Sequence, residues 1–228
     1  MFVQVLPTKS AVGKVVAAQV LLDLARTLSA AQTANLAISG GSAAEVVLPE
    51  LVKSELRYVI DWSAVHLWWA DERFVAPSSK DRNDVRALEI LAGLIPNVHR
   101  IGDSQEFASA EDAAARYSEA LKGIRLDIAI LGVGSDGHVA SVFPNHSSSD
   151  NSEQGAMAVY DSPKPPPTRV SLTPPQLASI ERPYIVALGK SKREALLAAL
   201  DPQVSATQLP AKRLPATWYV DLECAGRP

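Results

Sequence analysis

The segment Leu126–His138, with the sequence LDIAILGVGSDGH, carries the residue types best suited to chemistry in this chain. Its apolar run is followed by three glycines, with Asp136 and His138 between and after them. An apolar run bounded by glycine is typical of a buried strand in a parallel sheet, and glycines let the chain turn where a ligand approaches. Open α/β sheets bind ligands at the carboxyl ends of their strands. The segment therefore predicts an acid and an imidazole in a crevice.

The spacing of Gly132, Gly134 and Gly137 also matches the dinucleotide-binding fingerprint. That fingerprint requires a long helix directly after the third glycine, and Pro144 follows too soon to allow one. The segment 145–155 is polar and has the composition of a loop. We therefore expect no nicotinamide cofactor here. A glycine turn with a solvated aspartate and a histidine that only packs is the other alternative.

A second cluster, Ser39-Gly40-Gly41-Ser42, separates a predicted strand at 35–39 from a predicted helix that begins near residue 43. Backbone N–H groups at glycines, serine hydroxyls and the positive end of a helix together form an anion cradle. The cluster is not a Walker A loop, because no lysine follows the glycines. A tight turn with Ser42 as the helix N-cap fits the same pattern, and the sequence leaves both alternatives open.

Charged residues follow two more predicted strands. Asp71-Glu72-Arg73 comes directly after the strand expected at 65–70, and a polar loop at 76–83 follows it. Lys190 and Lys192 stand between the strand expected at 184–188 and a helix, where cations oppose the helix dipole. An anionic ligand would explain why Lys192 stands at this end of the helix, while Lys190 is expected to be solvated. Because parallel strands end at the same edge, we expect all these clusters on one rim of the sheet.

The alternation of apolar runs with 3.6-residue periodicity predicts an α/β fold with a parallel sheet. Helices are expected at 10–31, 84–92, 110–121 and 193–200, and further strands at 2–6, 157–160, 169–173 and 218–221. The proline-rich segment Ser162–Thr168 predicts a stiff connection, not a linker between domains. We therefore expect one domain over residues 1–228.

Composition narrows the classes of function. The net charge of −3 predicts no nucleic-acid or membrane partner. Cys224 is the only cysteine, and the four histidines lack ligand spacing, so we expect no disulfide framework and no metal. The N-terminus has no basic signal-peptide region and no apolar run is long enough to span a membrane, which predicts a cytoplasmic location. We expect a small-molecule partner, and a monomer or weak homo-oligomer.

Five motifs, in this order, resemble those of the 6-phosphogluconolactonase family. They are Ser39–Ser42, Asp71–Arg73 with Asn83, Gly132–His138 with Ala140-Ser141 and Phe143-Pro144, Pro167–Thr173, and Gly189–Lys192. The resemblance implies an open, mostly parallel sheet in three layers, Rossmann-like and similar to glucosamine-6-phosphate deaminases and ribose-5-phosphate isomerases. It also implies hydrolysis of 6-phosphogluconolactone to 6-phosphogluconate in the oxidative pentose phosphate pathway, without a cofactor.

The sequence departs from the family pattern at a few positions. Val139 stands where the family usually has Thr, and Val142 where it usually has Leu. The loop at 76–82 also differs from many members. Val139 lacks the hydroxyl that threonine supplies, so a hydrogen-bond donor is missing there.

The resemblance and the chemistry of the residues together suggest roles. A free imidazole titrates near ~6.5, so His138 is the expected base for water, with Asp136 orienting its ring. Arg73 would stabilise the oxyanion, and Asp71 would hold Arg73 or bind sugar hydroxyls. The phosphate would be bound by the loop of Ser39, Gly40, Gly41 and Ser42 and by Arg169 and Lys192, while Asn83 would position the sugar.

Two competing functions remain. An amino-sugar-phosphate deaminase or isomerase needs a carboxylate base, for which Asp71 is available, but the deaminases typically have Tyr at the position of Arg73. A non-catalytic sugar-phosphate sensor would keep the phosphate cradle and would lose His138 or Arg73. Both residues are present in this chain.

Overall fold

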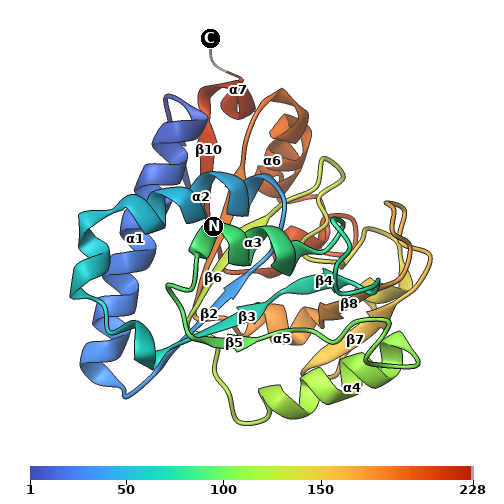
Figure 1. Cartoon of the computed structure of the whole chain (residues 1–228). Helices are drawn as coiled ribbons and strands as arrows, with labels where there is room; N and C mark the ends of the chain where they lie inside the picture. Colours follow the sequence, from blue (N-terminus) through green and yellow to red (C-terminus); the bar gives the residue numbers. More distant parts are fainter. Residues whose placement is uncertain (227–228) are drawn as a thin grey trace.

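The computed structural model describes residues 1–226, and its centre is a seven-stranded sheet in which every neighbouring pair is parallel. Figure 1 shows these strands spread through the middle of the molecule, from the lower left to the top. In spatial order the strands are β1 (Phe2–Leu6), β10 (Thr217–Asp221), β9 (Arg182–Ala187), β6 (Ile128–Gly132), β2 (Ala34–Ile38), β3 (Val65–Trp69) and β5 (Asn97–His99). The predicted α/β class with a parallel sheet is confirmed.

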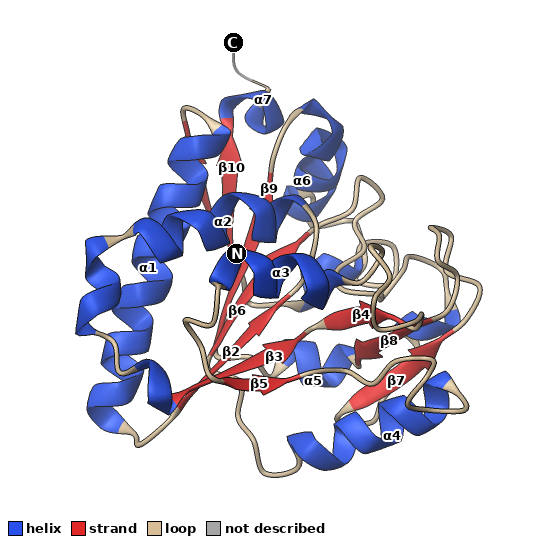
Figure 2. Cartoon of the chain, in the orientation of Figure 1, coloured by secondary structure: helices blue, strands red, loops and turns tan. Residues whose placement is uncertain are grey.

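Helices flank this sheet. In Figure 2, α2 (Ser42–Lys53) passes in front of the strands, α1 (Lys9–Ala30) lies along the left side, and α5 (Pro174–Ala178) lies behind the strands. Helix α1 begins at Lys9, one residue before the predicted start, because the Thr8 side chain caps it by accepting a hydrogen bond from the N–H of Ala11. The other helices are α3 (Asn83–Leu91), α4 (Ala110–Leu121), α6 (Arg193–Leu200) and α7 (Leu222–Ala225).

A second sheet of three antiparallel strands lies beside the large one (Figures 1 and 2). Its order is β4 (Asp71–Arg73), β8 (Arg169–Leu172) and β7 (Ala156–Val159). Asp71–Arg73 follows the third strand as predicted, but it also forms a strand of its own, which was not predicted. The chain leaves the large sheet at Ala70 and continues directly as an edge strand of the small one, because β8 is available there as a pairing partner.

The direction of winding reverses between β2 and β6. After β2 the chain builds outward through β3 to β5, and after β6 it builds in the opposite direction through β9 to β10. In open α/β sheets this reversal leaves a crevice outside the carboxyl ends of the two central strands. The glycine-rich segments that follow β2 and β6 are thus placed side by side.

One hydrophobic core cluster joins the two sheets. It contains Leu36, Ile130 and Ile185 of the large sheet together with Val170 and Leu172 of the small one. Short helical turns complete the connections: η1 (Glu55–Val59), η2 (Trp62–Ala64), η3 (Ser147–Ser149), η4 (Lys190–Lys192) and η5 (Pro210–Arg213). Across residues 1–226 no helix has the length and apolar character needed to cross a membrane.

Candidate active site

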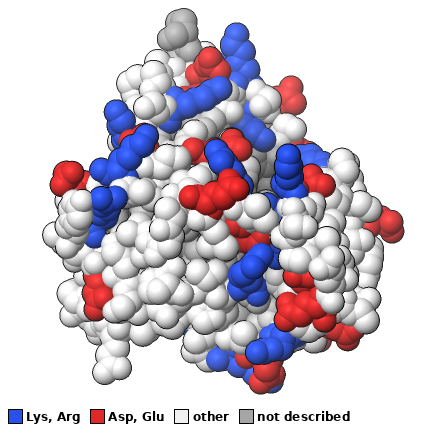
Figure 3. Space-filling view, viewed as in Figure 1, with Lys and Arg blue, Asp and Glu red and all other residues white. Residues whose placement is uncertain are grey.

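A cleft opens at the point where the winding reverses. It is lined by all the predicted site residues except Asp136: Ser39, Gly40, Gly41, Ser42, Asp71, Arg73, Asn83, His138, Arg169 and Lys192. Four neighbouring strands, β9, β6, β2 and β3, lead into it. The expectation that the clusters share one rim is therefore met. Figure 3 shows acidic and basic side chains interspersed over the adjoining face, without a large patch of one sign.

His138 and Asp136 lie in the turn that follows β6 and contact each other. The Nδ1 atom of His138 is 2.5 Å from Oδ1 of Asp136. An ionised carboxylate only accepts hydrogen bonds, so Nδ1 carries the hydrogen and Nε2 keeps its lone pair. Gly134 permits this contact, because a Cβ there would lie 2.0 Å from Nδ1 of His138.

Asp136 is ionised in this arrangement. Burial opposes ionisation, but the hydrogen bond from the His138 ring and the positive charge of Lys164 hold the pKa of Asp136 well below its usual range. The carboxylate therefore remains a permanent acceptor for the imidazole N–H at any ordinary pH.

The Ser39–Ser42 loop is hydrogen-bonded to the end of β6. The Ser39 hydroxyl oxygen accepts a hydrogen bond from the N–H of Gly132, at 2.9 Å. Helix α2 begins at Ser42 and its N-cap is Gly41, which has a φ of 73° and makes no side-chain cap. The alternative with Ser42 as N-cap is therefore wrong, and no side chain caps the first N–H groups of the helix, which leaves them available to an anion.

Asn83 reaches the same loop from α3. A Cβ at Gly40 would lie 1.9 Å from Oδ1 of Asn83, so only glycine fits there without moving the amide. The Nδ2 group of Asn83 donates to the backbone oxygen of Asp71 at 3.0 Å. This bond sets the amide against the start of β4.

Asp71 is buried and is held from the β8 side of the cleft. Its Oδ2 accepts from the hydroxyl of Ser141 at 2.7 Å and lies 3.8 Å from Nη1 of Arg169. Arg73 instead donates through Nη1 to the backbone oxygen of Asp81. Of the two roles expected for Asp71, contact with Arg73 is not formed, because each of the two side chains has other partners.

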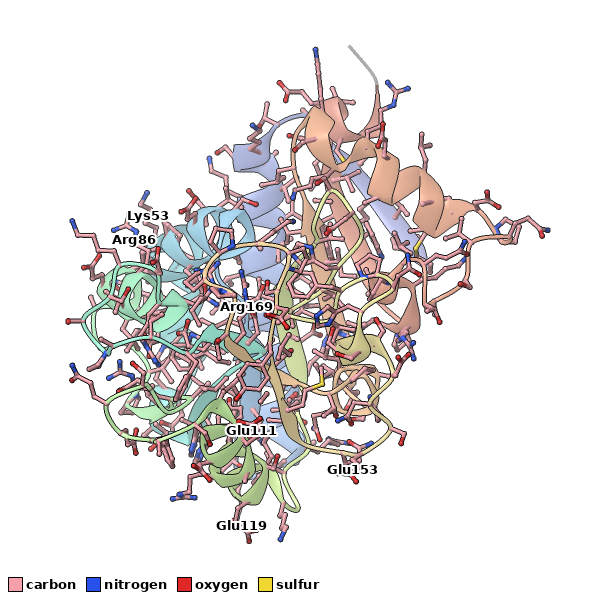
Figure 4. All side chains as sticks on the ribbon, turned by 90° about the vertical axis from the view of Figure 1, so that its right-hand side faces the viewer. Lys53, Arg86, Glu111, Glu119, Glu153 and Arg169 are labelled. Carbon is pink, nitrogen blue, oxygen red and sulfur yellow. The ribbon has the colours of Figure 1, made fainter. Side chains whose placement is uncertain are left out.

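Arg169 lies in the middle of the molecule, away from surface residues such as Glu119 and Lys53 (Figure 4). Its three guanidinium nitrogens already face protein oxygens. Nε donates to the oxygen of Pro166 at 3.2 Å, Nη2 to the oxygen of Lys164 at 2.9 Å, and Nη1 to the hydroxyl of Ser141 at 3.5 Å. Arg169 therefore lines the cleft while it holds the preceding proline-rich segment.

Lys164 was not among the predicted site residues, yet it lines the cleft from that proline-rich segment. Its Nζ is 3.2 Å from Nδ1 of His138 and 3.6 Å from Oδ1 of Asp136. Lys192 lies nearby, and its pKa is lowered by burial and by the charge of Lys164. A lysine between prolines carries no local signal of a site, because only the tertiary structure brings the segment to the turn after β6.

A buried ionic cluster behind the cleft was not predicted either. The Glu72 carboxylate accepts from the N–H groups of Asn83 and Asp84, at 2.7 and 2.9 Å, and so caps α3 from a distant strand. Burial and the neighbouring Asp84 raise the pKa of Glu72 to about 7. Arg82 donates twice to Asp84, at 3.0 and 2.7 Å. Within residues 1–226 no group of three His, Cys, Asp or Glu side chains is placed to hold a metal ion.

Comparisons with known proteins identify relatives of this chain. The family described as glucosamine-6-phosphate isomerases/6-phosphogluconolactonase matches residues 7–219. The chain is 31% identical to a 6-phosphogluconolactonase of Streptomyces coelicolor over 96% of this chain and 91% of that protein. It is also 31% identical to a probable 6-phosphogluconolactonase of Arabidopsis thaliana, over 84% and 80% of the two chains.

Solved structures share the fold. The structure of 6-phosphogluconolactonase from Trypanosoma brucei superposes with a TM-score of 0.85 at 23% identity, covering 99% of this chain and 97% of that one. The corresponding enzyme of Thermotoga maritima gives a TM-score of 0.82 at 23% identity, covering 96% and 99%. At these identities the likeness establishes the architecture of the two sheets and their helices.

Proposed function

Because the chain belongs to the family of glucosamine-6-phosphate isomerases and 6-phosphogluconolactonases, we propose that it is a 6-phosphogluconolactonase. It would hydrolyse 6-phospho-D-glucono-1,5-lactone to 6-phospho-D-gluconate, a step of the oxidative pentose phosphate pathway. The single domain of residues 1–228 would need no cofactor for this reaction. The observation that carries the proposal is the Asp136–His138 pair in a cleft lined by cations.

The first step is the attack of water on the lactone carbonyl. With the hydrogen of the His138 ring on Nδ1, Nε2 takes a proton from the water as its oxygen bonds to the carbonyl carbon. The carbonyl oxygen becomes an alkoxide, and Arg73 stabilises it from the β4 side of the cleft. Asp136 stabilises the imidazolium that forms.

The second step is the collapse of the tetrahedral intermediate. The bond between the carbonyl carbon and the ring oxygen breaks, and His138 returns its proton to that oxygen. The lactone becomes an open chain with a carboxylic acid, which loses its proton to water at neutral pH. No covalent enzyme intermediate is required, because a lactone is already an activated ester.

The far end of the substrate carries a phosphate. The uncapped N–H groups at the start of α2, the Ser39 and Ser42 hydroxyls and Lys192 supply donors and positive charge for it. Asp71 and Asn83 face the same cleft and would bind sugar hydroxyls between the two ends. Arg169 contributes charge across the cleft, although its nitrogens already have protein acceptors.

The proposal is tested first with freshly generated 6-phosphogluconolactone. The wild type is expected to hydrolyse the lactone well above the spontaneous rate. His138→Ala is expected to lose roughly 10²- to 10⁴-fold in kcat, because the general base is gone. His66→Ala, a histidine on β3 that does not line the cleft, serves as the matched control and should keep its activity.

Binding of 6-phosphogluconate should survive in His138→Ala, since the phosphate groups are untouched. Glucosamine 6-phosphate is offered in parallel. Turnover of the amino sugar without lactonase activity would indicate the deaminase or isomerase reaction, with Asp71 as base. Binding of both sugar phosphates without turnover of either would indicate a sensor. Either result would overturn the lactonase proposal.

A further inference from the structure

We propose that Lys164 is a positioning residue of the cleft, which balances the charge of Asp136 so that His138 stays a free base. The role of Lys164 in catalysis rests on the proposed function. The structure brings Asp136, His138 and Lys164, from two segments of the chain, into one cluster of charged and polar side chains.

The segment that carries Lys164, residues 162–167, is fixed by hydrogen bonds. The Ser162 N–H donates to the oxygen of Pro167 at 3.0 Å, and the Ser162 hydroxyl donates to the oxygen of Lys164 at 2.9 Å. Arg169 binds the same Lys164 oxygen at 2.9 Å. The backbone of Lys164 is therefore fixed from both sides, and its side chain extends toward the turn after β6.

The Lys164 ammonium and the His138 ring do not share a hydrogen. Nδ1 of His138 donates to Asp136, and an ammonium group has no lone pair to accept. Nζ of Lys164 and Nδ1 of His138 are therefore two donors that lie 3.2 Å apart. Both face the same acceptor, because Oδ1 of Asp136 lies 3.6 Å from Nζ and 2.5 Å from Nδ1.

This arrangement has a consequence for the base. A carboxylate beside an imidazole favours the imidazolium form, which cannot accept a proton from water. A cation at 3.2 Å disfavours that form. Asp136 thus fixes the orientation of the His138 ring, and Lys164 offsets the tendency of that carboxylate to keep the ring protonated. The lysine is half exposed, so the effect is smaller than the distance alone implies.

Other charges around the cleft act from farther away. Asp71 and Arg73 from β4, Arg169 from β8 and Lys192 from η4 line it together with His138. The remaining ring face of His138 packs on Phe143, with ring centroids 4.8 Å apart. In the part of the chain that the structure describes, Asp136 and Lys164 are the charged groups in direct contact with the His138 ring.

The test compares wild type, Lys164→Gln, Lys164→Met and Lys164→Arg. Lys190→Gln is the matched control, because Lys190 is exposed and does not line the cleft. The NMR titration of the His138 ring is expected to move up by ~1 pH unit in the two neutral variants, and to stay near the wild-type value in Lys164→Arg and Lys190→Gln. The His138 signal is assigned by its loss in His138→Asn.

Kinetics add a second signature. For a shift of ~1 unit, kcat/KM of Lys164→Gln should fall about tenfold on the acid side of the profile and recover as the pH rises above both titrations. A loss of equal size at every pH would make Lys164 a substrate ligand and would overturn the proposal, as would an unchanged His138 titration. If the wild type hydrolyses no lactone, the proposed function fails, while the titration still decides the role of Lys164.

Discussion

At the scale of single residues, the cleft depends on positions where a side chain is absent. Gly40 and Gly134 leave the space that Asn83 and His138 occupy, and a Cβ at either would lie within about 2 Å of those side chains. The reactive pair is therefore positioned by close backbone approach as much as by its own hydrogen bond. Small displacements of a catalytic group are costly, because proton transfer requires close alignment.

Gly134→Ala tests whether the missing side chain at Gly134 positions the Asp136–His138 pair. The new Cβ would lie 2.0 Å from Nδ1 of His138 and 2.1 Å from Oδ1 of Asp136, so the pair must separate or rotate. We expect kcat/KM for the lactone to fall by about 10²-fold or more, with the protein still folded. The measurement is the lactonase assay together with thermal unfolding.

Gly93→Ala is the matched control, since Gly93 has a φ of 78°, no atom within 4 Å of the place that a Cβ would take, and no part in the cleft. It should lose ~1–2 kcal/mol of stability through backbone strain and keep its kcat/KM. Wild-type kinetics in Gly134→Ala would show that the spacing between these groups does not matter.

At the scale of elements, α3 is held by a buried network that places Asn83 in the cleft. Asp84 accepts from Arg82 and also from Nε of Arg100, at 2.8 Å. Burial opposes ionisation of Asp84, but these arginines hold its pKa below the usual range. Glu72 caps the helix from β4, so the strand and the helix are fixed to each other.

Asp84→Asn should destabilise the protein by ~3–5 kcal/mol at pH 7, because it removes the nearer charged partner of the buried Arg82 guanidinium, at 2.7 Å, and leaves only Glu72 at 3.9 Å. The folded-state pKa is depressed, so the contribution of Asp84 is present above the unfolded value near ~3.9 and is lost as the pH falls through the folded value. The difference between wild type and variant should therefore shrink in acid. Urea unfolding at about pH 7 and about pH 3 measures it.

Glu89→Gln provides the comparison on the same helix. The Arg86–Glu89 pair is exposed, and such pairs contribute less than about 1 kcal/mol. An Asp84→Asn protein as stable as Glu89→Gln at neutral pH would show that the buried network does not hold α3.

At the scale of the whole molecule, the two sheets meet at Ala70. Its N–H donates to the oxygen of Ile38 in the large sheet, and its own oxygen accepts from the N–H of Leu172 in the small one, both at 2.8 Å. Strand β5 ends opposite Trp68, so the next residue of β3 lacks a strand partner on that side. Tyr117 of α4 supplies one: its hydroxyl accepts from the N–H of Trp69 at 2.8 Å and donates to its oxygen at 3.1 Å.

Tyr117→Phe should therefore destabilise the whole fold, because it leaves a buried N–H and a buried C=O without partners. We expect a loss of ~1–3 kcal/mol, or roughly 2–12 °C in Tm. Thermal unfolding by calorimetry is the measurement. Tyr58→Phe, at a tyrosine that is 69% exposed, should change the Tm little. Equal melting of both variants would mean that the hydroxyl of Tyr117 does not secure the junction.

The sequence by itself determined most of the helices and strands and the order of the candidate site residues along the chain. Helices α4 and α6 have the predicted bounds, and the glycine and charge clusters after β2, β3, β6 and β9 were visible as local patterns. Strand β5 was not predicted, since three residues after a proline carry too little periodicity. Local propensity depends on residues close in sequence, which is why these features could be read without a structure.

Only the tertiary structure decided which groups meet. Asp71 pairs with Arg169, and Lys164 reaches His138, because strand order and the small sheet bring segments 26 or more residues apart into contact. The partners of a charged side chain are set by packing and by the demand that buried polar groups be satisfied, and neither is encoded in its immediate neighbours. The family motifs indicated where the cleft lies, while its charge balance emerged only from the assembled fold.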